Sequence, residues 1–236
     1  MQTYQWLNLQ PGQLPLQPDG QIQSAVGHTC AITVIWPEAE KLLPSNSIIV
    51  DPCFSSSGYR SAKSELEKIN ATLSDIGFYF VTHDHYDHCL HFPNNEPGFS
   101  WENYPVTPDG GWPGLRLENC PGHHPELQAL HFLSQSGAVW IVSDAILNMA
   151  WLKEWKYYWP NGYRRSEIVQ TWRSLAGILA QADWVVPGHG SEFQVTPALL
   201  TDLLADFPYA AHAEDCPDVA DTLRQRLQTL KAESKR

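Results

Sequence analysis

The sequence has no long hydrophobic run and no basic, apolar start. Its longest apolar segments, such as residues 48–50 and 138–142, have the length of a strand. A membrane-spanning helix needs roughly 20 such residues, and the first six residues do not resemble a secretory signal. We therefore expect a protein of the cytoplasm that does not span a membrane.

Cysteine and basic residues are also scarce. The five cysteines are odd in number and lack the paired spacing of a zinc ribbon or a disulfide scaffold, so we expect free, mostly buried thiols. Lys and Arg number 15 against 26 Asp and Glu, which gives a formal net charge of −11. This charge argues against non-specific attraction to nucleic acid, although it is compatible with a local basic patch.

What the chain does have is enough apolar material for a sizeable core. Hydrophobic residues make up 43% of the 236 and charged residues 17%, which is the composition of a folded protein. We expect a single domain over residues 1–236. Strand patterns dominate the start of the chain, and amphipathic helix patterns follow at 61–73 and 166–182. This mixture favours an α+β fold in which helices cover sheets.

Polar residues stand at the ends of several expected strands. The strand at 78–81 runs into a His-x-His-x-Asp-His segment at 83–88. Further along, His123, Asp144 and His189 are isolated polar residues, the last two directly after strand patterns. Loops at strand ends commonly hold functional residues, so we expect these side chains to share one site.

The residue types in this set are those of a site for two divalent metal ions. In an extended segment alternate side chains face one way, so His83 and His85 can bind one ion together, while Asp87 and His88 point to a second. Imidazole and carboxylate ligands suit zinc, with iron or manganese as alternatives, whereas calcium and magnesium prefer oxygen ligands. We expect His123 to complete the first site, His189 the second, and Asp144 to bridge the ions. The full expected ligand set is His83, His85, Asp87, His88, His123, Asp144 and His189.

We expect the remaining histidines to have structural roles. Any single histidine is more often a core or surface residue than a ligand, and we apply this reading to His28, His131 and His212. His124 adjoins an expected ligand, but its ring should point away if that of His123 points inward. Cys89, which follows His88, is likewise expected not to bind metal.

These motifs, in this order, resemble the metallo-β-lactamase-fold hydrolases. The resemblance covers most of the chain, and it includes the Pro-Gly-His sequence ending at His123 and the Pro-Gly-His-Gly sequence around His189. It implies an αββα sandwich, in which two mixed β-sheets lie face to face with helices outside and metals at one edge. It also implies that Asp51 supports a ligating histidine from behind the metal loop, although Asp51 closing a turn with Pro52 is an equal alternative.

Two features bear on the branch of this superfamily. An aspartate at the bridging position, Asp144, resembles the glyoxalase II-like, lactonase-like and nuclease-like branches more than the true β-lactamases. Residues 182–190 together with Phe193 resemble the metallo-β-lactamase domain-containing protein 1-like branch, which adds a ribonuclease to the alternatives. The chain departs from the family pattern after His88 and after His123, so the substrate does not transfer from relatives.

The expected activity is hydrolysis by a hydroxide that bridges two metal ions. A bound metal lowers the pKa of its water to about 7, and Asp87 can orient the hydroxide and accept its proton. We expect an ester, thioester or lactone of a small molecule as substrate. The alternative within the fold is a phosphodiesterase or ribonuclease, which needs a basic groove. A di-iron redox protein is a third candidate, although such relatives typically have glutamate where this chain has His85.

Two further groups bear on the substrate. Arg164 and Arg165 are a basic pair that can bind a carboxylate or phosphate of an anionic small molecule, or simply be a solvated helix start. Aromatic residues gather at 92–112 and 151–163, which indicates either core packing or a lid over the metals. Neither the oligomeric state nor the identity of the substrate is encoded in these patterns.

Overall fold

The computed structural model describes residues 2–93, 100–103, 112–157 and 163–234. Its strands form two five-stranded sheets. The first sheet has the order β1-β2-β3-β4-β5 and the second the order β10-β9-β8-β7-β6. The strands of the first sheet are β1 (Tyr4–Gln10), β2 (Ile32–Pro37), β3 (Ile48–Val50), β4 (Phe78–Phe80) and β5 (Glu102–Asn103). Those of the second are β6 (Arg116–Asn119), β7 (Gln128–Ser134), β8 (Gly137–Ser143), β9 (Trp184–Pro187) and β10 (Phe193–Gln194).

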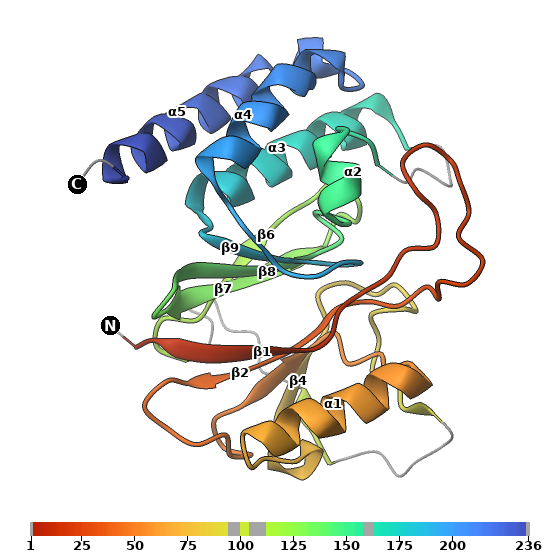
Figure 1. The fold of residues 1–236 in the computed structure, drawn as a ribbon, viewed down its shortest axis with the longest axis vertical. Helices are drawn as coiled ribbons and strands as arrows, with labels where there is room; N and C mark the ends of the chain where they lie inside the picture. Colours follow the sequence, from red (N-terminus) through yellow and green to blue (C-terminus); the bar gives the residue numbers. More distant parts are fainter. Residues whose placement is uncertain (1, 94–99, 104–111, 158–162, 235–236) are drawn as a thin grey trace.

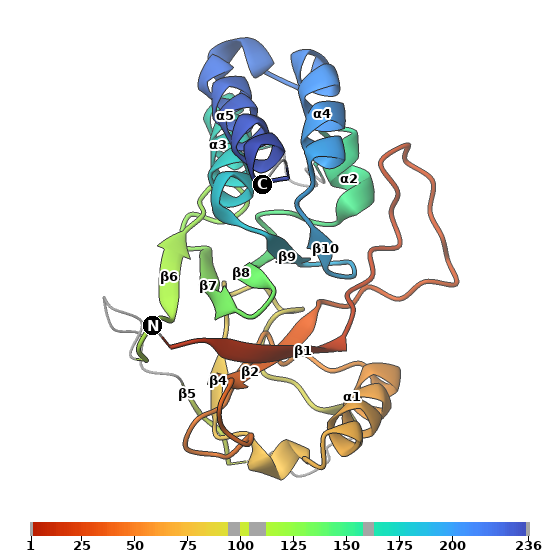
Figure 2. The same ribbon diagram turned by 60° about the vertical axis from the view of Figure 1, so that its left-hand side comes forward.

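Both sheets are mixed, and helices cover their outer faces. In the first sheet β3 pairs in parallel with β4, and in the second β8 pairs in parallel with β9, whereas β1–β2 and β6–β7 are antiparallel. Figure 1 shows α1 (Ser56–Lys68) below the first sheet and the remaining helices above the second, and Figure 2 shows the same layers from another side. These helices are α2 (Met149–Lys153), α3 (Arg165–Gln181), α4 (Pro197–Asp206) and α5 (Pro217–Glu233). The expected α+β sandwich of four layers, αββα, is confirmed.

Strand β2 shows why the sheets are buried on both sides. Ile32, Val34 and Trp36 belong to the apolar cluster between α1 and the first sheet, while Ile35 belongs to the cluster between the two sheets. Successive strand side chains point to opposite faces, so a strand with a helix on one side and a sheet on the other needs apolar residues throughout. This arrangement explains why Ile32, Val34, Ile35 and Trp36 are all apolar, with the buried Thr33 as the exception.

The helix boundaries follow their caps. Helix α4 begins after Thr196, whose side chain accepts a hydrogen bond from Leu199 N, and α5 begins at Pro217, both as the sequence predicts. Helix α1 begins at Ser56, five residues before the expected start, because Ser55 accepts a hydrogen bond from Gly58 N at 3.0 Å. None of the helices in the described ranges is long and apolar enough to cross a membrane.

Parallel pairing brings the polar strand ends to one edge of the sandwich. Asp51 follows β3 and its N–H donates to Phe80 O at the end of β4, which places it beside the 81–88 loop. On the other sheet, Ser143 pairs with Pro187, so that Asp144 and His189 leave adjacent strands. The polar residues that follow the strands of both sheets thereby lie in the same region.

Trp172 should be a main contributor to the stability of the helical layer. Its side chain is 1% exposed, lies in the cluster between the second sheet and its helices, and donates Nε1–H to Ala211 O at 2.8 Å. We predict that Trp172→Ala lowers the free energy of unfolding by about 3–5 kcal/mol in urea denaturation. The matched control is Tyr209→Ala, which removes an aromatic side chain that is 88% exposed. Equal effects of the two substitutions would contradict this account of the core.

Candidate metal centre

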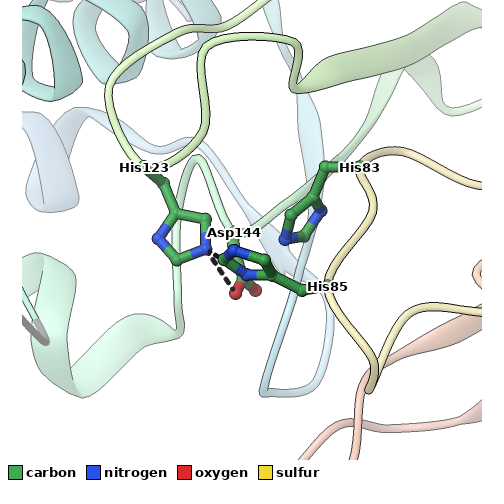
Figure 3. A group of neighbouring side chains, drawn as sticks. All are labelled: His83, His85, His123 and Asp144. Carbon is green, nitrogen blue, oxygen red and sulfur yellow. Dashed lines mark hydrogen bonds and ion pairs between the residues drawn. The ribbon is translucent and has the colours of Figure 1, made fainter. Parts of the chain in front are cut away.

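Four side chains form what we call the first cluster: His83 and Asp144, which are buried, and His85 and His123, which are half-buried. Their nitrogen and oxygen atoms lie within 4.8 Å of one another. His123 Nε2 is 3.0 Å from His85 Nδ1 and 3.3 Å from Asp144 Oδ2. Figure 3 shows the rings of His83 and His85, which share one loop, converging with His123 and Asp144 from two other segments. The structure thus brings together the residues that the sequence assigns to the first ion.

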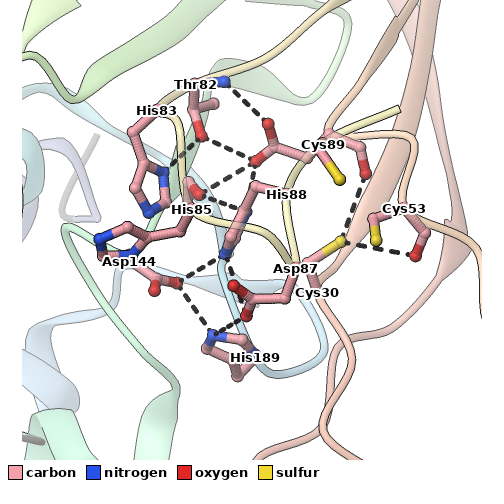
Figure 4. A network of polar contacts seen from close by, with 12 residues as sticks. Cys30, Cys53, Thr82, His83, His85, Asp87, His88, Cys89, Asp144 and His189 are labelled. Atoms are coloured by element: carbon pink, nitrogen blue, oxygen red, sulfur yellow. Dashed lines mark hydrogen bonds and ion pairs between the residues drawn. The ribbon is translucent and has the colours of Figure 1, made fainter. Parts of the chain in front are cut away.

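A second cluster, formed by His88, Asp144 and His189, adjoins the first. Asp144 Oδ1 lies 3.4 Å from His88 Nε2 and 3.1 Å from His189 Nε2. Asp87 flanks this cluster, with Oδ2 at 3.7 Å from each of the two histidine Nε2 atoms (Figure 4). Asp144 therefore directs one carboxylate oxygen to each cluster, which is the arrangement expected of a bridging ligand.

The donor atoms fit metal ions in their spacing. Ligand atoms about 2.0–2.1 Å from one ion in a tetrahedral arrangement are about 3.3–3.4 Å apart. The separations given above, from 3.0 to 3.7 Å, lie close to this value. In the part of the chain that the structure describes, His83 Nε2, His88 Nε2 and Asp144 Oδ1 are buried without a hydrogen-bond partner. Such groups cost about 1–3 kcal/mol each when left unpaired, and coordination to an ion would satisfy them.

Asp51 anchors the loop that carries the histidine motif. Its Oδ1 accepts a hydrogen bond from Thr82 N, and its Oδ2 accepts from the hydroxyls of Thr82 at 2.8 Å and Ser143 at 3.0 Å. The same oxygen is 2.9 Å from His88 Nδ1. Because a carboxylate only accepts, His88 carries a proton on Nδ1, and in the neutral ring the Nε2 lone pair would face the second cluster. Asp51 thus makes the contact that the family resemblance implies.

The Nδ1 atoms of three other histidines of the site also have hydrogen-bonding partners. The Thr82 hydroxyl gives its proton to Asp51 and so accepts one from His83 Nδ1 at 3.1 Å. His189 Nδ1 donates to Thr29 O at 3.0 Å, and His123 Nδ1 is 3.2 Å from Tyr163 Oη. When the outer nitrogen of a histidine is held in this way, the inner nitrogen is oriented toward a metal.

Burial keeps two of these rings neutral. It lowers the pKa of His83 to about 2, with the nearby His88 acting in the same direction, and it lowers the pKa of His123 to about 4. Burial alone would raise the pKa of Asp144, but His189 and His88 beside it hold that pKa well below its usual value. A neutral imidazole and an ionised carboxylate are the protonation states that bind a metal.

A cavity of about 360 Å³ opens on this centre. Its polar lining residues include His85, Asp87, His123, Asp144 and His189. Its apolar lining residues are Leu14, Pro15, Leu16 and Leu147, and the rings of Tyr86 and Tyr163 also line it. The centre is thus accessible to a small molecule from a partly apolar pocket.

The remaining candidate residues are not members of the two clusters, although the ring of His124 packs beside those of His83 and His85. His124 Nε2 is 3.1 Å from Asp84 Oδ1, whose side chain is 82% exposed, and His131 stacks on Trp140. Cys89 donates its thiol hydrogen to Tyr86 O. His212 lies near Glu214, between α4 and α5.

The basic pair does not face the cavity. The Arg165 guanidinium donates to Asp215 and to Glu214, and neither Arg164 nor Arg165 is among the described residues that line the pocket. The substrate-binding role of this pair stays a prediction that these contacts do not support.

The aromatic segments divide between core and cavity. Trp151, Trp155 and Tyr157 are buried in the core under the helices, whereas Tyr163 lines the cavity. Tyr158 and Trp159, and much of the 92–112 segment, lie outside the described residues. Core packing therefore accounts for most of the described members of the second aromatic group.

One residue of the centre was missed by sequence reasoning. His28, expected to be structural, has its Nε2 3.1 Å from Asp87 Oδ2 and lines the cavity. The sequence offers no signal for it, since His28 stands alone in the long segment between β1 and β2.

Known structures share this architecture. A protein of Thermotoga maritima, described as a candidate metallo-β-lactamase, matches with a TM-score of 0.53 at 15% identity, over 81% of this chain and 99% of that chain. The chain has the metallo-β-lactamase fold. Two further matches have TM-scores below 0.5. A metallo-β-lactamase family protein of Thermus thermophilus matches at 0.47 and 14% identity, over 98% of this chain and 79% of that chain. An N-acyl homoserine lactone hydrolase, solved with its product at the catalytic metal centre, matches at 0.49 and 14% identity, over 79% of this chain and 92% of that chain.

At such identities the similarity establishes the metallo-β-lactamase fold and not the reaction. No protein-family model matches the sequence, and no curated protein matches it either. The two clusters lie at an edge of this sandwich, where the resemblance in the sequence places the metals. The reaction therefore has to be inferred from the geometry of the centre itself.

The anchoring role of Asp51 can be tested by removing its charge. We predict that Asp51→Asn weakens zinc binding by about 10–100-fold, because His88 loses the anionic partner that orients it. Competition with a chromophoric chelator would measure this. The control is Asp84→Asn, which changes an exposed carboxylate in the same loop and should leave the affinity unchanged. An Asp51→Asn protein with wild-type affinity would contradict the assignment.

Proposed function

We propose that this chain is a metal-dependent hydrolase that binds two divalent ions and cleaves an ester, thioester or lactone of a small molecule. The observation that carries the proposal is the position of Asp144. Its carboxylate is buried, and its two oxygens face two separate groups of histidine nitrogens. A closed structural site commonly has four protein ligands for one ion and no cavity, whereas this centre has two adjoining clusters and opens on a pocket.

The residues divide between two ions. His83, His85 and His123 would hold the first, while His88 and His189, with Asp87, would hold the second, and Asp144 would contact both. A set of imidazoles and carboxylates suits zinc, with iron and manganese as alternatives. Ions bound in this way acidify water and polarise a substrate oxygen.

Asp87 is the residue that we assign to proton transfer. Its carboxylate lines the cavity, so it can contact the water that attacks the substrate. Burial acts to raise the pKa of Asp87, but the hydrogen bond from His28 and the nearby His88 lower it to about 2. The group is therefore ionised at neutral pH, and it can accept a hydrogen bond from that water and orient it.

The cavity favours an uncharged, partly apolar substrate. Of the described residues that line it, none is Lys or Arg, and four are leucine or proline. Apart from the proposed ions, no described lining residue offers a guanidinium or ammonium group to pair with a phosphodiester, and the net charge of the protein is negative. A carbonyl compound with an apolar substituent fits these walls, so we place ester, thioester and lactone hydrolysis ahead of phosphodiesterase or ribonuclease activity.

A substrate panel tests the proposal. We predict that the zinc-loaded protein hydrolyses a p-nitrophenyl ester, a γ-lactone or an acyl thioester in a chelator-sensitive manner. It should show no hydrolysis of bis(p-nitrophenyl) phosphate. His123→Ala should lower the rate by about 100-fold, because it removes a donor from the first cluster. The control, His212→Ala, changes a histidine outside both clusters and should retain the wild-type rate.

Two results would contradict this assignment. Hydrolysis of the phosphodiester alone would favour the alternative hypothesis that the chain is a phosphodiesterase. Carbonyl hydrolysis that survives both chelation and His123→Ala would place the reaction outside the two clusters.

A further inference from the structure

The segment before β2 touches the second cluster at two consecutive residues. Thr29 O accepts the hydrogen bond from His189 Nδ1 at 3.0 Å, and His28 Nε2 is 3.1 Å from Asp87 Oδ2. The segment is itself held in place, because Thr29 exchanges two backbone hydrogen bonds with Gln13, at 2.7 and 3.0 Å. Its position next to the cluster is therefore defined by the backbone.

His28 and Asp87 both line the cavity. The ligating atoms of His28, Asp87 and His189 are within 4.8 Å of one another, and the rings of His28 and His189 have their centroids 4.8 Å apart. The His28 side chain is 36% exposed, against 11% for Asp87. His28 is thus the more exposed partner of this pair.

The arrangement indicates a hydrogen-bond donor rather than a further metal ligand. His28 groups with Asp87 and His189, but it is not part of the group that His88, Asp144 and His189 form. The ligating atom of His28 therefore does not lie within 4.8 Å of all three members of the second cluster. At 3.1 Å from a carboxylate oxygen, Nε2 carries a proton and donates it to that oxygen, since a carboxylate only accepts.

We propose that His28 is a positioning residue for the second metal ion, acting by a hydrogen bond from Nε2 that fixes the orientation of the Asp87 carboxylate. The inference rests on the proposed function, because it needs an ion at the second cluster. A carboxylate turns freely about its last bond unless a partner holds one oxygen. With Asp87 Oδ2 held by His28 and His189 held by Thr29 O, two side chains of this site are oriented by one short backbone segment. Partners of this kind typically change metal affinity by about 10–100-fold when removed.

The test compares His28→Ala with His28→Gln in the full chain. Zinc is titrated against a chromophoric chelator, and the absorption spectrum of the Co²⁺-substituted protein is recorded in parallel. We expect His28→Ala to bind the first equivalent as the wild type does and the second about 10–100-fold more weakly, with a changed spectrum for the second Co²⁺. His28→Gln should recover most of the affinity and the wild-type spectrum, because its amide N–H can donate at a similar reach. His212→Ala serves as the control, and circular dichroism checks that each variant is folded.

Each other result overturns the inference in a distinct way. Wild-type affinity in His28→Ala would show that Asp87 needs no donor. Equal weakening in both variants would mean that the imidazole nitrogen itself binds the ion. A wild-type protein that binds no second equivalent would instead remove the proposed function on which the inference rests.

Discussion

Asp144 imposes the constraint that organises the centre, because an ionised carboxylate in a protein interior needs positive charge or hydrogen bonds on every side. Its side chain is 5% exposed, and three histidine nitrogens approach its two oxygens within 3.4 Å. The carboxylate raises the pKa of His88 well above its usual value despite burial, with Asp51 acting in the same direction. Divalent ions would supply this charge directly, and the imidazoles would then be neutral ligands. The carboxylate thereby links the two clusters into one centre.

The fold holds this arrangement through strained strand ends. Asp51 directly follows β3, and Ser143 is the last residue of β8. Their φ angles are positive, at 50° and 48°, which residues other than glycine rarely adopt. The two residues hydrogen-bond to one another across the sandwich, and both contact His88 Nδ1. Backbone strain of this kind persists where surrounding contacts determine it, and it clusters at functional sites. The chain turns sharply at both positions, and the turns bring the ligating residues of the two sheets together.

Sequence reasoning found the parts of this protein that depend on short segments, and it missed those that depend on long-range packing. The His-x-His-x-Asp-His segment and the polar residues at 144 and 189 were recognisable because each follows a strand pattern, while the four-layer order came from the family resemblance. The start of α1 was wrong by five residues, since the cap at Ser55 carries a weak signal beside the amphipathic pattern. His28 could not be predicted, because its approach to Asp87 depends on the path of the whole β1–β2 segment. The ion pair between Arg165 and Asp215 joins residues 50 positions apart, so it could not be predicted from the sequence either.

The most direct test of this account is the metal content of each chain, measured by elemental analysis of protein purified without a histidine tag, for the wild type and Asp144→Ala together. The account predicts two equivalents of zinc, iron or manganese in the wild type. It predicts a clear fall in the variant, because one carboxylate contributes to both ions. One equivalent or none in the wild type, or two equivalents that survive the substitution, would contradict the bridging role of Asp144.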